Sequence, residues 1–181
     1  PEIQHRTCRP FPASIHVSGG QLYIRLIFPP EASEQYGCPR EGMAGYRFTE
    51  GNIHLELFWK DKDALRSPEA LWLGIRPEVE NPSCWQMVKS GAALSPSNVV
   101  SNGNRQLHVV QDLSYTGADS RLHIPPTDAP LVSLGGKKLY QPDNSMPELS
   151  QGFFFLLYNN RWGTNFKQWF EEDMRFAFDI S

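Results

Sequence analysis

The residues most able to do chemistry lie near the end of the chain, in a segment rich in aromatic rings, amides and charged groups. Trp162 follows Asn160 and Arg161, and Asn165 and Asp173 come after it. An aromatic ring can cover the apolar face of a sugar, while asparagine and aspartate side chains hydrogen-bond its hydroxyl groups. Arg161 adds a contact for an anion or a hydroxyl. The segment therefore predicts a carbohydrate-binding loop that contains these five residues.

The same segment also fits a purely structural role. Tryptophan and phenylalanine at the junction of a strand and a loop commonly close the end of a hydrophobic core. Asn159–Asn160 and Gly163–Asn165 are typical turn sequences. Composition by itself favours this structural interpretation over a ligand site.

A second polar cluster contains Arg105 and His108, which follow the sequence Asn102–Asn104. An arginine and a histidine beside a turn could contact a sugar or a neighbouring domain. The Asn–Gly–Asn sequence is also typical of a tight turn with positive φ angles, after which Arg105 would pair with Asp112. The turn interpretation is the favoured one, and Arg105 and His108 are secondary candidates for binding.

No pattern in the chain indicates catalysis or a bound metal. The neighbouring carboxylates Glu171, Glu172 and Asp173 are typical of a solvated loop. A Gly-x-Ser-x-Gly nucleophile motif and a phosphate-binding loop are both missing from the sequence. The histidines are scattered, without the spacing of metal ligands, at positions 5, 16, 54, 108 and 123. We expect no catalytic residue, no metal ligand and no cofactor in this chain.

The elements that hold these residues are predicted to be strands. Fifteen prolines and fourteen glycines interrupt the chain at the spacing of strands and turns. Hydrophobic residues alternate along residues 21–28 and 53–59, which predicts strands with one buried face. Residues 153–158 are apolar throughout, which predicts a central strand covered on both faces. Further strands are expected at residues 14–17, 46–48, 71–75, 85–89, 106–110, 121–124, 130–133 and 174–180.

Helix is expected only near residues 31–35 and 166–171. Many strands separated by turns rich in proline and glycine predict an all-β protein, a large antiparallel β-sandwich with little helix. No repeat or long linker divides the chain, so we expect residues 1–181 to form a single domain. Because the chain starts with Pro1, we also expect it to be a piece of a longer protein.

Composition and charge narrow the range of partners. The formal net charge of −3 gives no basic face for nucleic acid, and no apolar run reaches the roughly 20 residues that cross a membrane. Three cysteines are typical of reduced thiols, although a Cys8–Cys38 bridge stays open as the best disulfide candidate, ahead of any pairing with Cys84. The odd cysteine count, and the lack of a glycosylation sequon and of a signal-like start, favour a cytoplasmic protein.

Several motifs along the chain resemble one known family. At the end of the chain these are Asn159–Asn160, Trp162–Phe166, Trp169, Asp173 and Arg175–Phe176. Earlier motifs, in the same order as in the family, are residues 29–41, 69–73, 95–108 and 128–132. Together they resemble the C-terminal region of proteins related to glycoside hydrolase family 38, the α-mannosidase-like enzymes and their large relatives.

The resemblance implies a fold and a partner. In such enzymes a large C-terminal β-sandwich, similar to the galactose-mutarotase type, lies against a catalytic (β/α) barrel. The barrel carries the catalytic carboxylates and a zinc ion, and nothing in this chain matches those residues. The resemblance therefore implies a non-catalytic module of a glycoside hydrolase, whose partners are the barrel of the same protein and a carbohydrate.

Three hypotheses remain open: an accessory module of this kind, an independent carbohydrate-binding module, and a purely structural interaction domain. An accessory module should expose an apolar surface for the barrel, whereas a free lectin should not. In the structural domain Trp162 would be part of the core, and the change Trp162→Ala would cost about 3–5 kcal/mol. The accessory module is our preferred interpretation.

Overall fold

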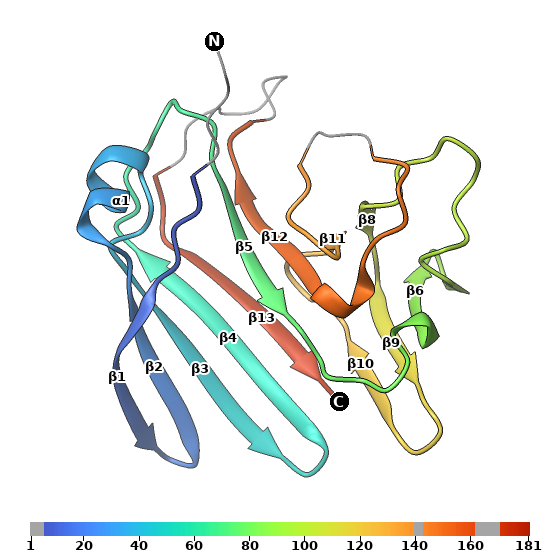
Figure 1. The fold of residues 1–181 in the computed structure, drawn as a ribbon. Helices are drawn as coiled ribbons and strands as arrows, with labels where there is room; N and C mark the ends of the chain where they lie inside the picture. The colour runs from blue at the N-terminus through green and yellow to red at the C-terminus, as the bar shows by residue number, and fades with distance from the viewer. Residues whose placement is uncertain (1–5, 140–142, 162–170) are drawn as a thin grey trace. The chain divides into compact units, whose positions relative to one another are not determined.

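The computed structural model describes residues 6–139, 143–161 and 171–181 (Figure 1). These residues form thirteen strands in three sheets, one α-helix and two short 3-10 helices, with 47% of residues in strands and 8% in helices. The strand pairings described below are antiparallel. The predicted all-β class with little helix is therefore confirmed. Within the described residues, no helix is long and apolar enough to cross a membrane.

The chain divides into two compact units. The first contains residues 1–48, 55–69 and 160–175, and the second contains residues 49–54, 70–159 and 176–181. The prediction of one domain over residues 1–181 stays a prediction.

The first unit is built on a five-stranded sheet with the strand order β1-β2-β3-β4-β13. Its strands are β1 (Phe11–Ser18), β2 (Gln21–Ile27), β3 (Glu41–Thr49), β4 (Asn52–Lys60) and β13 (Met174–Ile180). The second unit includes part of this sheet: Thr49 of β3, residues 52–54 of β4 and residues 176–180 of β13. Gly19 and Gly20 form the turn between β1 and β2 with φ angles of 58° and 74°, which only glycine adopts at low cost. The β1 strand lies at the edge of the sheet.

The helix α1 (Pro30–Tyr36) follows β2 and is the helix that the sequence predicts near residues 31–35. It begins with a proline, whose missing N–H costs nothing at this position. It ends at Gly37, where a φ of 65° gives the left-handed cap that glycine favours. The helix expected at residues 166–171 lies outside the described residues, apart from Glu171.

The second unit contains two four-stranded sheets, with the orders β10-β9-β6-β7 and β5-β12-β11-β8. A ring contact joins the two sheets: the ring centroid of Trp85 in β6 lies 4.6 Å from that of Phe153 in β12. Within its own sheet, Trp85 also lies 5.4 Å from Tyr115 of β9. All three side chains are buried. This packing of two antiparallel sheets confirms the predicted β-sandwich. The strands are β5 (Ala70–Ile75), β6 (Trp85–Lys89), β7 (Ala92–Leu94), β8 (Leu107–Val109), β9 (Asp112–Thr116), β10 (Arg121–Ile124), β11 (Leu131–Leu134) and β12 (Phe153–Asn159).

Strand β12 is central, as its continuous apolar sequence predicts. It pairs with β5 on one side and with β11 on the other, and Phe153 and Phe155 are fully buried. The 3-10 helix η2 (Leu149–Gln151) precedes it, and Gly152 makes the connection with a φ of 90°. A Cβ atom at Gly152 would lie 2.5 Å from the carbonyl oxygen of Ile75, so only glycine fits there. The other 3-10 helix, η1 (Pro82–Cys84), comes directly before β6.

Candidate functional site

Hydrogen bonds attach the start of the predicted carbohydrate-binding loop to another stretch of the first unit. Asn160 precedes the loop, and its side chain is only 8% exposed. Its Oδ1 accepts a hydrogen bond from the N–H of Glu69 at 2.8 Å. Its Nδ2 donates to the carbonyl oxygens of Leu65 and Ser67, both at 2.9 Å. Both amide N–H groups of Asn160 are thus engaged with the backbone of residues 65–69.

The other end of the loop attaches to the same stretch of chain. Oδ1 of Asp173 accepts a hydrogen bond from the N–H of Asp61 at 3.1 Å. Asp61 adopts a φ of 52°, which turns the backbone at the start of residues 61–69. We call residues 61–69 the loop base, because both Asn160 and Asp173 are bound to it.

A buried ion pair lies within the loop base. Nζ of Lys62 lies 2.5 Å from Oε1 of Glu69, and the two side chains are 0% and 10% exposed. Lys62 also donates to the carbonyl oxygen of Asp63 at 3.1 Å. Two charges removed from water are stable only when they are closely paired, so this contact fixes the two ends of the loop base relative to each other.

The five predicted binding residues therefore have different positions. Asn160 and Asp173 lie at the two ends of the loop, on the loop base, and their observed contacts are structural. Arg161 is exposed beside Asn160. Trp162 and Asn165 lie outside the described residues. Glu69 appeared in the sequence analysis only as part of a family motif, and neither Lys62 nor the backbone of residues 65–69 was identified, because a hydrogen bond across 91 positions leaves no local signal.

The second predicted cluster, around Arg105 and His108, belongs to the second unit. Asn102 has a φ of 63°, and the N–H of Gly103 donates to the carbonyl oxygen of Val100 at 2.9 Å, which is the tight turn that the sequence favours. Arg105 donates to the carbonyl oxygens of Ser97 and Val99, at 2.7 and 3.3 Å.

The expected pairing of Arg105 with Asp112 is wrong. The carboxylate of Asp112 instead lies 2.8 Å from Nδ1 of His123, on the neighbouring strand β10. The carboxylate also accepts the N–H of Ile124 at 3.0 Å. The neighbouring strand thus provides the partners of Asp112.

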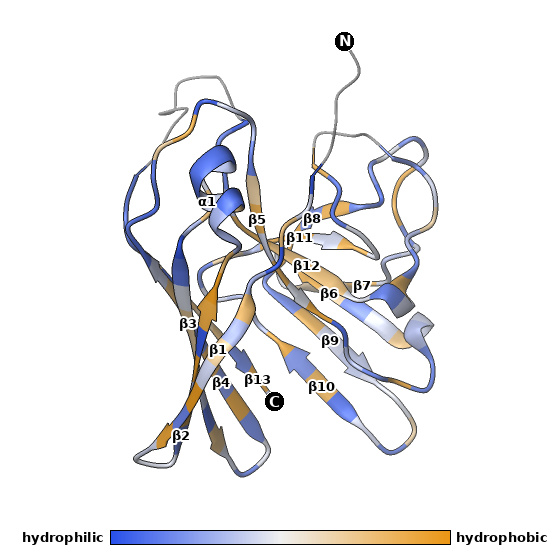
Figure 2. Ribbon diagram, turned by 60° about the vertical axis from the view of Figure 1, so that its left-hand side comes forward, coloured by the Kyte–Doolittle hydropathy of each residue, from blue (hydrophilic) through white to orange (hydrophobic). Residues whose placement is uncertain are grey.

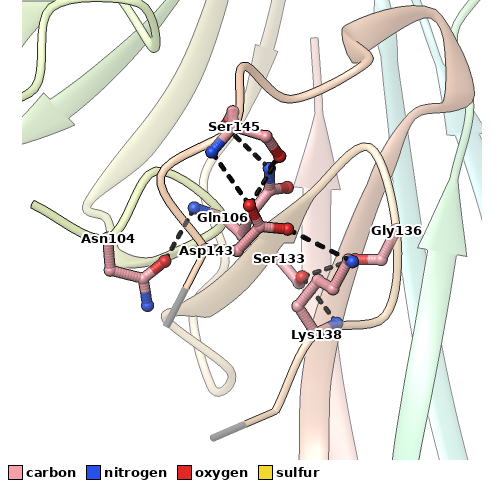
Figure 3. Close-up of polar contacts among 7 residues, drawn as sticks. All are labelled: Asn104, Gln106, Ser133, Gly136, Lys138, Asp143 and Ser145. Carbon is pink, nitrogen blue, oxygen red and sulfur yellow. Dashed lines mark hydrogen bonds and ion pairs between the residues drawn. The ribbon is translucent and has the colours of Figure 1, made fainter. Parts of the chain in front are cut away.

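Residues after this turn join a polar network with two other loops (Figure 3). The buried Gln106 donates from Nε2 to the carbonyl and the hydroxyl of Ser145, at 3.0 and 3.2 Å. Figure 3 shows Asp143 between Ser145 and Lys138; its carboxylate accepts from the Ser145 hydroxyl at 2.5 Å and lies 3.3 Å from Nζ of Lys138. The hydrogen bonds from Ser145, followed by the contact with Lys138, hold the pKa of Asp143 below its ordinary value.

This network binds loops to each other and leaves its polar groups satisfied. Ser133 of β11 donates to the carbonyl oxygen of Gly136 and accepts the N–H of Lys138 at 3.0 Å. A serine, a lysine and an aspartate lie close together here, but each takes part in a contact that closes a loop. We therefore infer that the network has a structural role, which is to hold loops of the second unit together.

His108 differs from its neighbours because it is buried and incompletely hydrogen-bonded. It is 6% exposed, and its Nδ1 lies 3.4 Å from Nζ of Lys89. Its Nε2 has no hydrogen-bond partner among the described residues. Burial lowers the pKa of His108, and the nearby Lys89 charge lowers it further, against a contact with the Arg105 backbone that raises it.

Other histidines are part of pairs on strands. Nδ1 of His54 lies 2.5 Å from a carboxylate oxygen of Asp179, and His123 contacts Asp112 as described. Within residues 6–139, 143–161 and 171–181, no group of three or more histidine, cysteine or acidic side chains could hold a metal ion. The expected absence of a metal and of a cofactor stays a prediction.

Comparison of the chain with models of protein families, with curated proteins and with solved structures found no match.

Proposed function

We propose that this chain is a non-catalytic β-sandwich module of an α-mannosidase-like glycoside hydrolase, and that it packs against the catalytic barrel of the same protein. The loop after Asn160 would then contribute to the rim of the sugar-binding site. The proposal rests on the family resemblance of the sequence and on one observation, an exposed apolar surface on the sheet of the first unit.

This surface lies on one side of strands β1, β2 and β3. The strand register places Ile15 opposite Ile24 and Val17 opposite Leu22. The same register places Leu22 opposite Tyr46. We call the surface formed by these residues and by Phe48 the apolar face; its members are Ile15, Val17, Leu22, Ile24, Tyr46 and Phe48.

Three members of the apolar face are strongly exposed. Ile15 is 66%, Val17 68% and Phe48 55% exposed. Strand β1 is eight residues long and lies at the edge of the sheet, and every one of its residues is exposed. Hydrophobic positions are visible along the β1–β2 hairpin in Figure 2.

The opposite side of the same strands carries most of their polar residues, together with Ile27 and Met43. Because side chains alternate along a strand, Ser14 and His16 point away from the apolar face, as do Tyr23, Arg25 and Arg47. An independent soluble domain would place the apolar side inward and the polar side outward. An exposed cluster of this kind on an edge hairpin is typical of a surface that another domain covers. The partner that the family resemblance offers is the barrel.

The loop base supports the second part of the proposal. Asn160 and Asp173 attach both ends of the loop to residues 61–69, and the buried Lys62–Glu69 pair stiffens that stretch. These attached ends support a role in sugar binding for the segment that they enclose, which includes the candidates Trp162 and Asn165. The same observation would favour an independent carbohydrate-binding module, which is the alternative function. The alternative leaves the apolar face unexplained.

The test compares two double variants of the whole parent enzyme. Ile15→Lys with Val17→Lys puts charges on the apolar face, whereas Ser14→Lys with His16→Lys adds the same charges to the polar side of the same strand. We expect the first to lower the melting temperature of the parent enzyme and its hydrolysis of an aryl α-mannoside, and the second to change neither.

The isolated chain serves as the control for folding. Since Ile15 and Val17 are already exposed, both double variants of the isolated chain should melt at the temperature of the unaltered chain. A parent enzyme that tolerates Ile15→Lys with Val17→Lys would contradict packing against the barrel. Sugar binding by the isolated chain would then favour the independent module.

A further inference from the structure

We propose that Cys8 and Cys38 form a reversible disulfide bond that ties the N-terminal segment to the end of helix α1. The inference does not depend on the proposed function. It starts from the positions of two free thiols of the first unit, Cys8 before helix α1 and Cys38 after it, which lie close enough for Cys8 to influence the pKa of Cys38.

The surrounding contacts show why these two residues meet. Cys38 follows α1, and its N–H donates to the carbonyl oxygen of Ala32 at 3.2 Å. Cys8 and Ala32 both line a pocket of about 380 Å³ between residues 6–8 and α1. Ala32 therefore lies near both cysteines, of which Cys8 precedes the helix in the sequence and Cys38 follows it.

A second contact holds the N-terminal segment in the same position. The guanidinium of Arg6 hydrogen-bonds the hydroxyl of Tyr36, and its Cζ lies 5.0 Å from the centre of the Tyr36 ring. Arg6 thus contacts Tyr36, and each cysteine follows one of these two residues by two positions: Cys8 follows Arg6, and Cys38 follows Tyr36. A disulfide would therefore join two segments that the reduced fold already holds side by side.

The two thiols are suited to different steps of the reaction. Cys8 is exposed, while Cys38 is partly buried. Burial, followed by the neighbouring Cys8 and Glu69, raises the pKa of Cys38 to about 11, so Cys38 stays protonated at neutral pH. Cys8 is therefore the residue that meets an oxidant first, and Cys38 is the residue that resolves the intermediate.

The oxidant that we propose is a small disulfide of the glutathione type. The Cys8 thiolate attacks one sulfur of glutathione disulfide, whose S–S bond breaks, and one glutathione leaves as a thiolate that takes up a proton. Cys38 then loses its proton and attacks the Cys8 sulfur of the mixed disulfide, which expels the second glutathione. Two protein thiols are oxidised to one disulfide, and one glutathione disulfide is reduced to two glutathione molecules.

The test incubates the folded chain with mixtures of reduced and oxidised glutathione, blocks the remaining thiols with an alkylating agent, and maps the peptides by mass spectrometry. We expect one linked peptide pair, containing Cys8 and Cys38, while Cys84 is alkylated. The closed loop should raise the melting temperature by roughly 5–10 °C relative to the reduced chain. Addition of excess reduced glutathione should reverse both changes.

Single variants separate the proposed bond from general oxidation. Cys38→Ser should stop at a glutathione adduct on Cys8, Cys8→Ser should form no intramolecular bond, and Cys84→Ser should behave like the unaltered chain. Because Cys8 is exposed, its variant should fold normally. Glutathione adducts on Cys8 and Cys38 without a link between them, or a linked pair that contains Cys84, would overturn the proposal.

Discussion

At the scale of single residues, the side chain of Asn160 connects the end of β12 to a stretch of chain that lies far from it in sequence. Its amide makes three hydrogen bonds to the backbone of residues 65–69 and is almost completely buried. The sequence identified Asn160 as important for the loop after it. It could not identify the role, because the partners are backbone groups that no pattern of side chains reveals.

Replacement of Asn160 by alanine should destabilise the chain by about 2–4 kcal/mol, since buried backbone groups would lose their partners. Urea unfolding measures this change. Asn98→Ala is the control, because it removes the same amide from an exposed turn and should change the free energy of unfolding by less than about 0.5 kcal/mol. Equal effects of the two variants would mean that the amide of Asn160 has no special role.

His108 should make the stability of the chain depend on pH. Burial lowers its pKa in the folded state below the ordinary value of 6.5. As the pH falls below about 6.5, the unfolded chain therefore binds a proton at this residue before the folded chain does, and stability falls. The stabilising effect is fully present above pH 6.5 and is lost as the pH decreases through the lowered pKa.

This dependence can be measured by urea unfolding between pH 7.5 and 5.0. The variant His108→Gln should lose less stability over this range than the unaltered chain, while His16→Gln, at an exposed position, should lose the same amount. An unchanged slope in His108→Gln would show that other groups cause the pH dependence.

At the scale of elements, the loop base depends on one buried ion pair. Lys62→Met leaves the carboxylate of Glu69 buried without its cation, so we expect a loss of about 3–5 kcal/mol. The double variant Lys62→Met with Glu69→Leu removes both charges and should be more stable than the single variant. Unfolding in urea compares them.

An exposed ion pair of the same unit provides the control for the buried pair. Arg25 and Glu41 are each about half exposed, so Arg25→Met should cost less than about 1 kcal/mol. If Lys62→Met is as mild as Arg25→Met, the buried pair does not stabilise the loop base.

The sequence predicted elements well where the hydrophobic pattern was long. The apolar run of β12, the alternation in β2 and β4 and the short helix α1 all follow from local patterns. Strand β9 was missed because its alternation covers only Leu113 and Tyr115. Strand β3 was predicted too short because Gly42 and Gly45 interrupt its apolar pattern; Gly45 leaves room for the ring of Tyr23.

The candidate site was less predictable than the fold. The types of Asn160, Asp173 and Arg105 drew attention to the right segments, but the partners of all three are backbone groups elsewhere in the chain. The exposure of Ile15 and Val17 was equally hidden. An alternating pattern shows that a strand has an apolar side, and does not show whether anything covers it.

At the scale of the whole molecule, the apolar face is the feature that most requires an explanation. Its residues alternate with polar ones along β1, so one side of the hairpin is suited to water and the other to a protein surface. The proposed packing of this chain against another domain of a larger enzyme would account for this arrangement.

The most direct test of this central claim is to determine the size of the native polypeptide that contains this chain, by denaturing gel electrophoresis and peptide mapping in its source cells. If the chain is a module of a glycoside hydrolase, peptides from before Pro1 will belong to a polypeptide several times larger than 20.6 kDa, the mass of the chain itself. A native polypeptide of about 20.6 kDa that contains no further peptides would contradict the claim.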